Sequence, residues 1–584
     1  GRSGPCPRCF FFFFFVRASR PGGAPTKAGV RDNRGLSLMG AAMRLVVAAL
    51  VLSLTSLHAM AKSGPCEQGV VWEDINGNGQ FDSGEKPLPG VKISDGVKLV
   101  LTDSDGAYRL PYVDGRTIFV IKPAGYDLPQ RKDGLPDSWL NVRISPGPAL
   151  KFGGMPVAAA TCRDFGLRLA KPSPNRQKRL DVVVLADPQT KSMRDVDFYQ
   201  RDIIDSLKKE TAIDLGHSFG DFYFSGLAGD LGISLGDIVD DDLSLFPAVT
   251  AATVSLAVPW LHVAGNHDLD FDAASDQDSL LTFRQHFGPD TYAWEEPEAN
   301  FLILDDVIYQ PGKKPAYIGG LRDDQFAFLE AYLPTVPKDR LLILGVHIPF
   351  FDTKPDVETF RHADRARLFA LLKDFPHVLL LSGHDHTQRH VRHGPDSGWH
   401  GATPLHEYNV GAASGAYWSG VKDAQGIPDA TMGDGTPNGY ARLQVMAGGE
   451  YRLAWHPARD AETALAVHAP RVLRQGAYPA WGVFANVFMG EADTRVEYRV
   501  DGGEWKPMKY VIQPDPRLLV ENVADDLADA LRGFDRSPEA TASLHLWRGA
   551  LPTDLPVGEH MIDVRVQDRW HGEQTARTQY RLEA

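Results

Sequence analysis

Side chains able to bind a metal ion follow almost every buried strand that is predicted in the middle of this chain of 584 residues. Short apolar runs bounded by polar residues are typical of strands covered on both faces. Such runs occur at residues 180–185, 231–235, 260–263, 301–304, 341–344 and 378–381. Helical spacing at 196–210 follows the first of them, so residues 178–455 predict an α/β domain.

The polar residues that follow these strands are two carboxylates, an amide and three imidazoles: Asp187, Asp237, Asn266, His347, His384 and His386. Ligands of open α/β sheets bind beyond the carboxyl ends of the strands, so we expect these side chains to share one crevice. Each motif taken alone also fits a helix cap, a turn or a surface histidine. Their joint occurrence predicts a metal site.

Taken in order, the motifs resemble those of the calcineurin-like metallophosphoesterase superfamily across residues 180–455: D-x-Q, G-D-x-x-D, G-N-H-D, G-x-H and G-H-x-H. The resemblance implies an α/β (α+β) core, a β-sandwich flanked by helices, with two metal ions. The first metal would be bound by Asp187, Asp237 and His386, and Gln189 stands where the family usually has histidine. The second would be bound by Asp237, Asn266, His347 and His384, so Asp237 would bridge the pair.

The ligand types also indicate which metals and which chemistry to expect. Mixed nitrogen and oxygen ligands suit Mn, Fe or Zn better than Ca or Mg. The glutamine motif is similar to that of manganese-dependent ADP-ribose/CDP-alcohol diphosphatases, which favours Mn and a phosphodiester or diphosphate bond. The resemblance implies attack by a metal-bridging hydroxide, with His267 beside Asn266 as the general acid and Asp268 orienting it.

Substrate recognition is weakly encoded. Tyr417 and Trp418 lie in a Gly-rich stretch and either stack on a base or sugar or pack beneath a loop. The partner we expect is a phosphorylated small molecule, lipid or nucleotide. The net charge of −14 argues against nucleic-acid binding, and the oligomeric state stays open.

Two alternatives remain at this point. A phosphomonoesterase would need extra cationic contacts, and no cluster of Arg or Lys is obvious near the motifs. A non-catalytic surface or adhesion protein, stabilised by calcium and carrying a degenerate phosphoesterase core, would explain Gln189 and the flanking domains.

The flanking regions predict β domains at 62–170 and 459–584, the latter with a helix at 519–532. Such domains resemble those of exported bacterial calcineurin-like phosphoesterases. In the first of them, one segment fits D-x-[DN]-x-[DN]-G-x5-E and predicts either an EF-hand-like calcium loop or a plain hairpin turn. Its oxygen ligands would be Asp74, Asn76, Asn78, Gln80, Asp82 and Glu85. Cys66 and Cys162 bracket this domain and predict either a disulfide or two free thiols.

The first residues predict targeting rather than folded structure. Residues 1–38 have no periodicity, and we interpret them as upstream sequence before a start at Met39 or Met43, or as an unusual extension. Residues 39–61 have the pattern of a signal peptide, with Arg44, an apolar run and an A-x-A site. We therefore expect a periplasmic or secreted protein whose mature chain has no transmembrane anchor.

Overall fold

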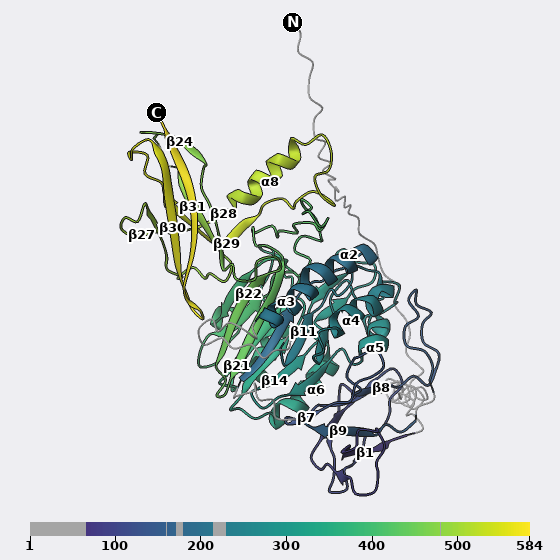
Figure 1. Ribbon diagram of the computed structural model, residues 1–584. Helices are drawn as coiled ribbons and strands as arrows, with labels where there is room; N and C mark the ends of the chain where they lie inside the picture. Colours follow the sequence, from purple (N-terminus) through teal and green to yellow (C-terminus); the bar gives the residue numbers. More distant parts are fainter. Residues whose placement is uncertain (1–65, 159–160, 171–178, 214–228, 479–480) are drawn as a thin grey trace, which may run out of the picture. The chain divides into compact units, whose positions relative to one another are not determined.

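The computed structural model describes residues 66–158, 161–170, 179–213, 229–478 and 481–584 (Figure 1). The predicted upstream segment and the predicted signal peptide lie outside these ranges. Among the helices described, none combines the length and the apolar character that crossing a bilayer requires.

Two sheets form the core of the central region. The first has the order β12-β11-β10-β21-β22, with β10, β11 and β12 parallel. Its strands are β10 (Arg179–Leu185), β11 (Leu231–Leu235), β12 (Trp260–Val263), β21 (Gly439–Met446) and β22 (Tyr451–Pro457). The second has the order β13-β14-β17-β18-β20-β19, with β14, β17, β18 and β20 parallel. Its strands are β13 (Tyr292–Glu295), β14 (Ala299–Ile303), β17 (Leu341–Gly345), β18 (Val378–Ser382), β19 (Arg389–His393) and β20 (Leu405–Asn409).

Alternation along each strand decides what its side chains pack against. Val182 and Val184 of β10 join a core cluster that also contains Ile343 of β17, so this face lies between the two sheets. Val183 and Leu185 belong to a second cluster, which they share with the helices. Both faces are therefore buried, which explains why the strands read as unbroken apolar runs.

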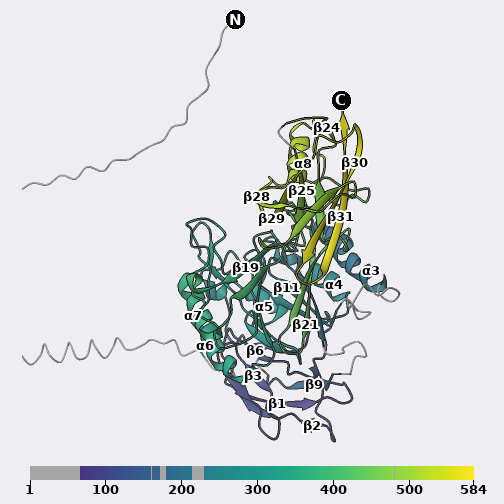
Figure 2. The same ribbon diagram turned by 90° about the vertical axis from the view of Figure 1, so that its left-hand side faces the viewer.

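Helices cover the outer faces of both sheets. Figure 2 shows α6 (Asp323–Tyr332) and α7 (His362–Leu372) on one side of the strands, and α3 (Asp205–Ile213) and α4 (Phe246–Val254) on the other. The remaining helices are α2 (Met193–Phe198) and α5 (Leu281–Phe287), and a short β15–β16 hairpin pairs Val307–Tyr309 with Tyr317–Gly319. A helix was predicted at 196–210. The observed helical stretch is longer, because α2, a π-helical segment at Tyr199–Ile204 and α3 follow one another without a break.

The N-terminal region forms two small sheets. The first contains β1 (Gln68–Glu73), β2 (Lys86–Pro87), β5 (Ala107–Arg109), β7 (Tyr126–Asp127) and β9 (Phe165–Leu169). The second contains β3 (Lys92–Ser94), β4 (Leu99–Leu101), β6 (Thr117–Val120) and β8 (Trp139–Asn141). Apolar side chains of both sheets form one core. A disulfide joins Cys66 to Cys162 and closes a span of 96 residues.

The C-terminal region also has two sheets around a core of its own. The first contains β23 (Leu465–His468), β25 (Gly482–Val487), β28 (Lys509–Pro514) and β29 (Ala542–Ala550). The second contains β24 (Val472–Arg474), β26 (Val496–Val500), β27 (Lys506–Pro507), β30 (Gly558–Asp568) and β31 (Gly572–Glu583).

The helix predicted in this region at 519–532 is shifted. Helix α8 spans Pro516–Asp526, because Asp515 caps its N-terminus and Pro516 suits the first helical position. Carboxylates in its last turn oppose the helix dipole, which explains the early end at Asp526.

Candidate metal centre

The predicted metal ligands follow the carboxyl ends of five parallel core strands. Asp187, Asp237 and Asn266 follow β10, β11 and β12 of the first sheet. His347 follows β17, and His384 and His386 follow β18 of the second sheet. Because parallel strands end at one edge, both sheets deliver ligands to the same place.

Four side chains of this set converge most closely. The Nε2 atom of His347 lies 3.3 Å from Oδ1 of Asp237 and 3.0 Å from Oδ1 of Asn266. Nδ1 of His384 lies 3.2 Å from the same Nε2 atom. These four residues are the set predicted for the second metal, and three of them form a group whose ligand atoms all lie within 4.8 Å of one another.

The set predicted for the first metal is more open. Nε2 of His386 lies 3.5 Å from Oδ1 of Asp187. The Asp187 carboxylate accepts the backbone N–H of His384, at 3.0 Å to Oδ2, which ties the two sets together. The geometry therefore brings together the predicted ligands of both sets.

Backbone carbonyls orient two of the imidazoles. Nδ1 of His347 lies 2.8 Å from the carbonyl oxygen of Leu235, and Nδ1 of His386 lies 2.7 Å from that of Gly415. A carbonyl oxygen only accepts, so each Nδ1 carries the proton. The Nε2 atom of each ring therefore faces the site, and a bound metal ion would take the place of any proton held there.

Gln189 gives an independent test of whether this site suits a cation. Its side chain is 1% exposed, and its Oε1 atom is buried without a hydrogen-bond partner among the described residues. An unsatisfied buried carbonyl is costly unless something binds it. The backbone N–H of Gln189 donates to the carbonyl of Asp237 at 2.8 Å, which keeps Gln189 beside the predicted bridging ligand. The donor set fits a divalent cation.

Backbone strain collects at the same place. Asp187, Gln189, Asp237, His384 and His386 all have positive φ angles, between 40° and 71°. Such conformations are unfavourable for residues other than glycine, persist only where the surrounding structure holds them, and cluster at active and ligand-binding sites. A Cβ atom on Gly265 would lie 2.3 Å from Oδ1 of Asp237, so only glycine fits before Asn266.

The electrostatics of the site favour positive charge. Burial alone would lower the pKa of His347, but the charges of Asp237 and Asp187 raise it to about 10. Burial and the neighbouring His347 lower the pKa of His384 to about 3. The carboxylates thus attract a cation, while the second ring stays neutral and able to bind a metal.

His267 stands beside this group with different partners. Its backbone N–H donates to Oδ1 of Asp237 at 2.8 Å, and its ring Nδ1 lies 2.7 Å from Asp241 and 3.1 Å from Asp240. The side chains of His267, Asp240 and Asp241 also lie close enough together to hold a metal ion. Asp241 is exposed, and Asp240 also pairs with Lys191 at 3.3 Å.

The role predicted for Asp268 is wrong. Its buried carboxylate accepts backbone N–H groups of Ile238, Val239 and Gly265, at 2.9–3.2 Å, and so braces the loops that carry Asp237 and Asn266. Burial and the charge of Asp237 raise its pKa to about 7. Asp241 orients the His267 ring instead, and three successive aspartates in the sequence gave no means of choosing among them.

The two aromatic residues considered for substrate binding, Tyr417 and Trp418, differ in their exposure to solvent. Trp418 is fully buried and donates through Nε1 to the carbonyl of Pro188, so of the two predicted alternatives it follows the second and packs beneath the surface. Tyr417 is 48% exposed, and its ring centroid lies 4.6 Å from that of His386. No motif in the sequence points to Tyr317, whose ring meets that of His384 edge-on with the centroids 5.9 Å apart, because only the fold brings the two together.

The predicted calcium loop connects β1 to β2. Asp74 is buried, and its carboxylate accepts the N–H groups of Gly77 and Asn78 at 2.7 and 3.1 Å. The carboxylate of Glu85 accepts the N–H groups of Ile75 and Asp82, both at 3.0 Å. The loop is therefore closed by its own oxygen atoms, and calcium binding stays a prediction.

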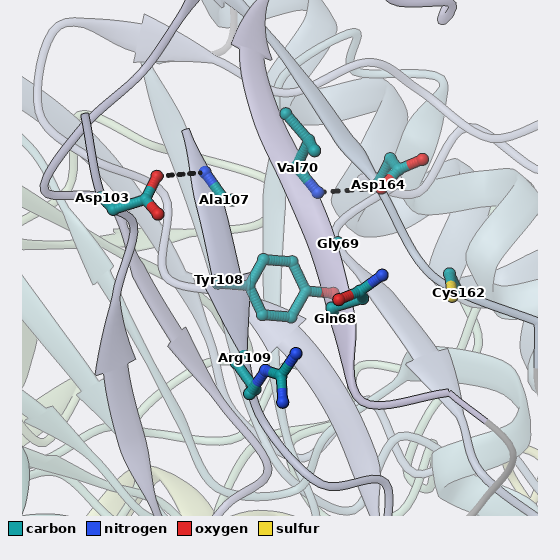
Figure 3. A pocket seen from close by; sticks show the side chains of 9 residues that line it. All are labelled: Gln68, Gly69, Val70, Asp103, Ala107, Tyr108, Arg109, Cys162 and Asp164. Carbon is teal, nitrogen blue, oxygen red and sulfur yellow. Dashed lines mark hydrogen bonds between the residues drawn. The ribbon is translucent and has the colours of Figure 1, made fainter. Parts of the chain in front are cut away.

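A cavity of about 540 Å³ lies elsewhere, in the N-terminal region next to the disulfide (Figure 3). It is lined by Gln68, Gly69, Val70, Asp103, Ala107, Tyr108, Arg109, Cys162 and Asp164. It contains none of the predicted metal ligands, so it is not the candidate active site.

Comparison with known families identifies the class of protein. The family model for calcineurin-like phosphoesterase matches residues 180–388, which include every predicted metal ligand. Models for the N-terminal and C-terminal parts of calcineurin-like phosphoesterase match residues 75–152 and 407–574. The chain belongs to the calcineurin-like phosphoesterases, with both flanking domains, and is a metal-dependent phosphoester hydrolase. The predicted fold class is confirmed.

Similar solved structures include a dimetal phosphatase from Danio rerio, 14% identical, covering 48% of this chain and 96% of that one, with a TM-score of 0.32. Purple acid phosphatase PPD1 from yellow lupin (Lupinus luteus) seeds is 13% identical, covers 64% of this chain and 67% of that one, and has a TM-score of 0.34. A search of curated proteins finds no match.

Proposed function

We propose that this phosphoesterase uses two divalent metal ions, with Mn favoured, to hydrolyse a phosphodiester or diphosphate bond, and that His267 is its general acid. The observation that carries the proposal is the position of His267, which is bonded to Asp237 through its backbone and to Asp241 through its ring. When bound, the two ions would activate water as the nucleophile and neutralise charge on the phosphate oxygens.

The surroundings of His267 suit proton donation. Burial would lower the pKa of the ring, but the hydrogen bond to Asp241 and the charges of Asp237 and Asp240 raise it to about 9. These surroundings therefore favour the protonated ring. Because Nδ1 is held by Asp241, Nε2 is the atom that can give its proton to a leaving oxygen.

The charge around the site supports a diester or diphosphate rather than a monoester. Asp240, Asp241 and Asp385 lie close to the metal ligands in the sequence and are at least partly exposed. A phosphomonoester carries a second negative charge, which these carboxylates would repel. A phosphodiester carries one charge on the attacked phosphate and meets less repulsion there, and the second charge of a diphosphate diester lies on the neighbouring phosphate.

Two further proposals concern the export of the protein and its N-terminal domain. We propose that it is exported through the predicted signal peptide, and that the loop from Asp74 to Glu85 binds calcium; the disulfide of the same domain supports an oxidising compartment. The presence of all predicted ligands together with His267 argues against the non-catalytic adhesion alternative.

The proposal is tested by following bis-p-nitrophenyl phosphate and p-nitrophenyl phosphate with added Mn²⁺. We expect metal-dependent turnover of the diester at the higher rate. Asp237→Asn should abolish it, whereas His400→Ala, a change at an exposed histidine, should leave it intact. Preference for the monoester would overturn the choice of substrate, and equal activity of Asp237→Asn and the unaltered protein would overturn the site.

A further inference from the structure

One lysine lies beside the candidate metal centre, where sequence analysis found no cluster of cations. The Nζ atom of Lys191 is 3.3 Å from Oδ2 of Asp240. The same atom lies over the ring of Tyr417, 5.1 Å from its centroid. The Lys191 side chain is 49% exposed, so it can still reach a ligand from solvent.

The backbone beneath Lys191 is fixed from two directions. Its N–H donates to Oδ2 of Asp195, in the first turn of α2, at 2.9 Å. The preceding residue, Thr190, accepts the N–H of Asp240 at 3.0 Å. These two hydrogen bonds fix the backbone from which the Lys191 side chain extends. Its ammonium is held by Asp240 and Tyr417.

Asp240 joins this ammonium to the proposed general acid. While Oδ2 of Asp240 pairs with Lys191, its Oδ1 lies 3.1 Å from Nδ1 of His267. Lys191 is therefore separated by one carboxylate from the ring that we propose protonates the leaving group. Tyr417, which packs on His386, supports the ammonium from the other side.

We propose that Lys191 binds a second phosphate group of the substrate, on the leaving-group side, so that the substrate is a diphosphate diester. The inference rests on the proposed function and narrows it. A lysine ammonium is a point charge that pairs well with one phosphate. Among the described residues, the contacts of Asp240, Asp241, His267 and Tyr417 include this lysine and no arginine. An uncharged leaving group would not use it.

The reaction balances without any further reactant. The oxygen of water bonds to the attacked phosphorus, and the bond from that phosphorus to the bridging oxygen breaks. The bridging oxygen leaves with the second phosphate and takes a proton from His267, and a proton lost by the water replaces it. The products are two phosphomonoesters.

The test compares two diesters on the full chain loaded with Mn²⁺. ADP-ribose contains a diphosphate, whereas thymidine 5′-p-nitrophenyl phosphate contains a single phosphate. Lys191→Met should lower kcat/KM at least tenfold for ADP-ribose, mainly through KM, and less than about twofold for the second compound; one charge-assisted hydrogen bond is worth such a factor. Lys191→Arg should keep most of the activity, and Lys506→Met, at an exposed lysine, should change neither value.

Equal losses on both substrates, or no loss on either, would overturn the inference. A binding measurement separates this outcome from failure of the proposed function. Lys191→Met should weaken binding of α,β-methylene-ADP at least tenfold and of AMP much less, whether or not the protein turns over either diester. If Lys191→Met and the unaltered protein bound α,β-methylene-ADP equally well, a second phosphate site at Lys191 would be contradicted.

Discussion

The carboxylate of Asp434 lies 3.1 Å from Nε2 of His545, a residue of β29 in the C-terminal region. Both side chains are buried. The same Oδ2 atom of Asp434 accepts the backbone N–H of Gln388 at 2.9 Å, two residues after His386. The C-terminal region is thus bonded through one carboxylate to the segment that carries two predicted metal ligands.

Removing this contact should affect both folding and metal binding. His545→Ala leaves the buried Asp434 without its imidazole partner, and we expect a loss of about 2–4 kcal/mol in the free energy of unfolding. We also expect weaker metal binding, because the segment after His386 loses its support. Chemical denaturation and metal titration measure the two effects. Exposed His400→Ala is the control, and unchanged metal affinity in His545→Ala would contradict the link to the site.

The acid role of His267 predicts a dependence on the leaving group. p-Nitrophenolate leaves readily without a proton, whereas an alkoxide does not. His267→Ala should therefore lower kcat by about 10²–10⁴ for an alkyl phosphodiester and much less for bis-p-nitrophenyl phosphate. The ratio of the two losses is the measurement. A similar loss for both substrates would assign His267 to binding or folding instead.

The two carboxylates at the His267 ring should share their task. Nδ1 of His267 lies 2.7 Å from Asp241 and 3.1 Å from Asp240, so either can hold the ring when the other is lost. We expect about tenfold or less loss of kcat for Asp241→Asn or Asp240→Asn, and a loss close to that of His267→Ala for the double variant. Asp268→Asn tests a different property, the stability of the loops. If Asp241→Asn alone matched His267→Ala, sharing would be disproved.

Calcium should stabilise the loop between β1 and β2. A ligand that binds only the folded state raises Tm with its concentration, so Ca²⁺ should raise Tm while Mg²⁺ has a smaller effect. Glu85→Gln removes a charged ligand and should abolish most of that rise. Thermal unfolding in EGTA, Ca²⁺ and Mg²⁺ measures it. Identical Tm values in EGTA and Ca²⁺ would leave the loop as a plain hairpin turn.

Two buried histidines predict loss of stability in acid. Burial lowers the pKa of His262 to about 3 and that of His286 to about 4, from about 6.5. Both rings are neutral in the folded state, so as the pH falls below about 6.5 the unfolded chain binds more protons. Folding then loses about 1.4 kcal/mol per pH unit for each histidine, until the folded pKa is reached.

The variant that checks this is His286→Gln, which can keep a hydrogen bond to Thr250; the ring nitrogen lies 2.8 Å from its hydroxyl. Denaturation at several pH values should show a slope reduced by one proton between pH 6 and pH 5. An unchanged slope would mean that other groups control the acid transition.

Much of this architecture could be predicted from the sequence because its signals are local. Runs such as Leu180–Leu185 are buried on both faces, so their apolar character is continuous and visible. Asp187, Asp237 and His384 follow such runs directly, which made the metal site predictable from strand ends.

Other features depended on contacts between distant segments. The choice of Asp241 over Asp268 as the partner of His267 follows from the fold of two loops that are separate in the sequence. Trp418 is buried because Pro188 accepts its N–H across 230 residues. The sequence does not show that Lys191 lies near the metal ligands, because its contacts with Asp240 and Tyr417 form only in the folded chain.

The central claim is that Asp237 bridges two metal ions. Elemental analysis of the purified full chain, combined with anomalous diffraction from its crystals, tests this directly. We predict about two transition-metal ions per chain, one beside Asp187 and His386 and one beside His347 and His384, and loss of both in Asp237→Ala. A chain that binds no Mn, Fe or Zn at these residues, and that hydrolyses no phosphoester when these metals are added, would contradict the account.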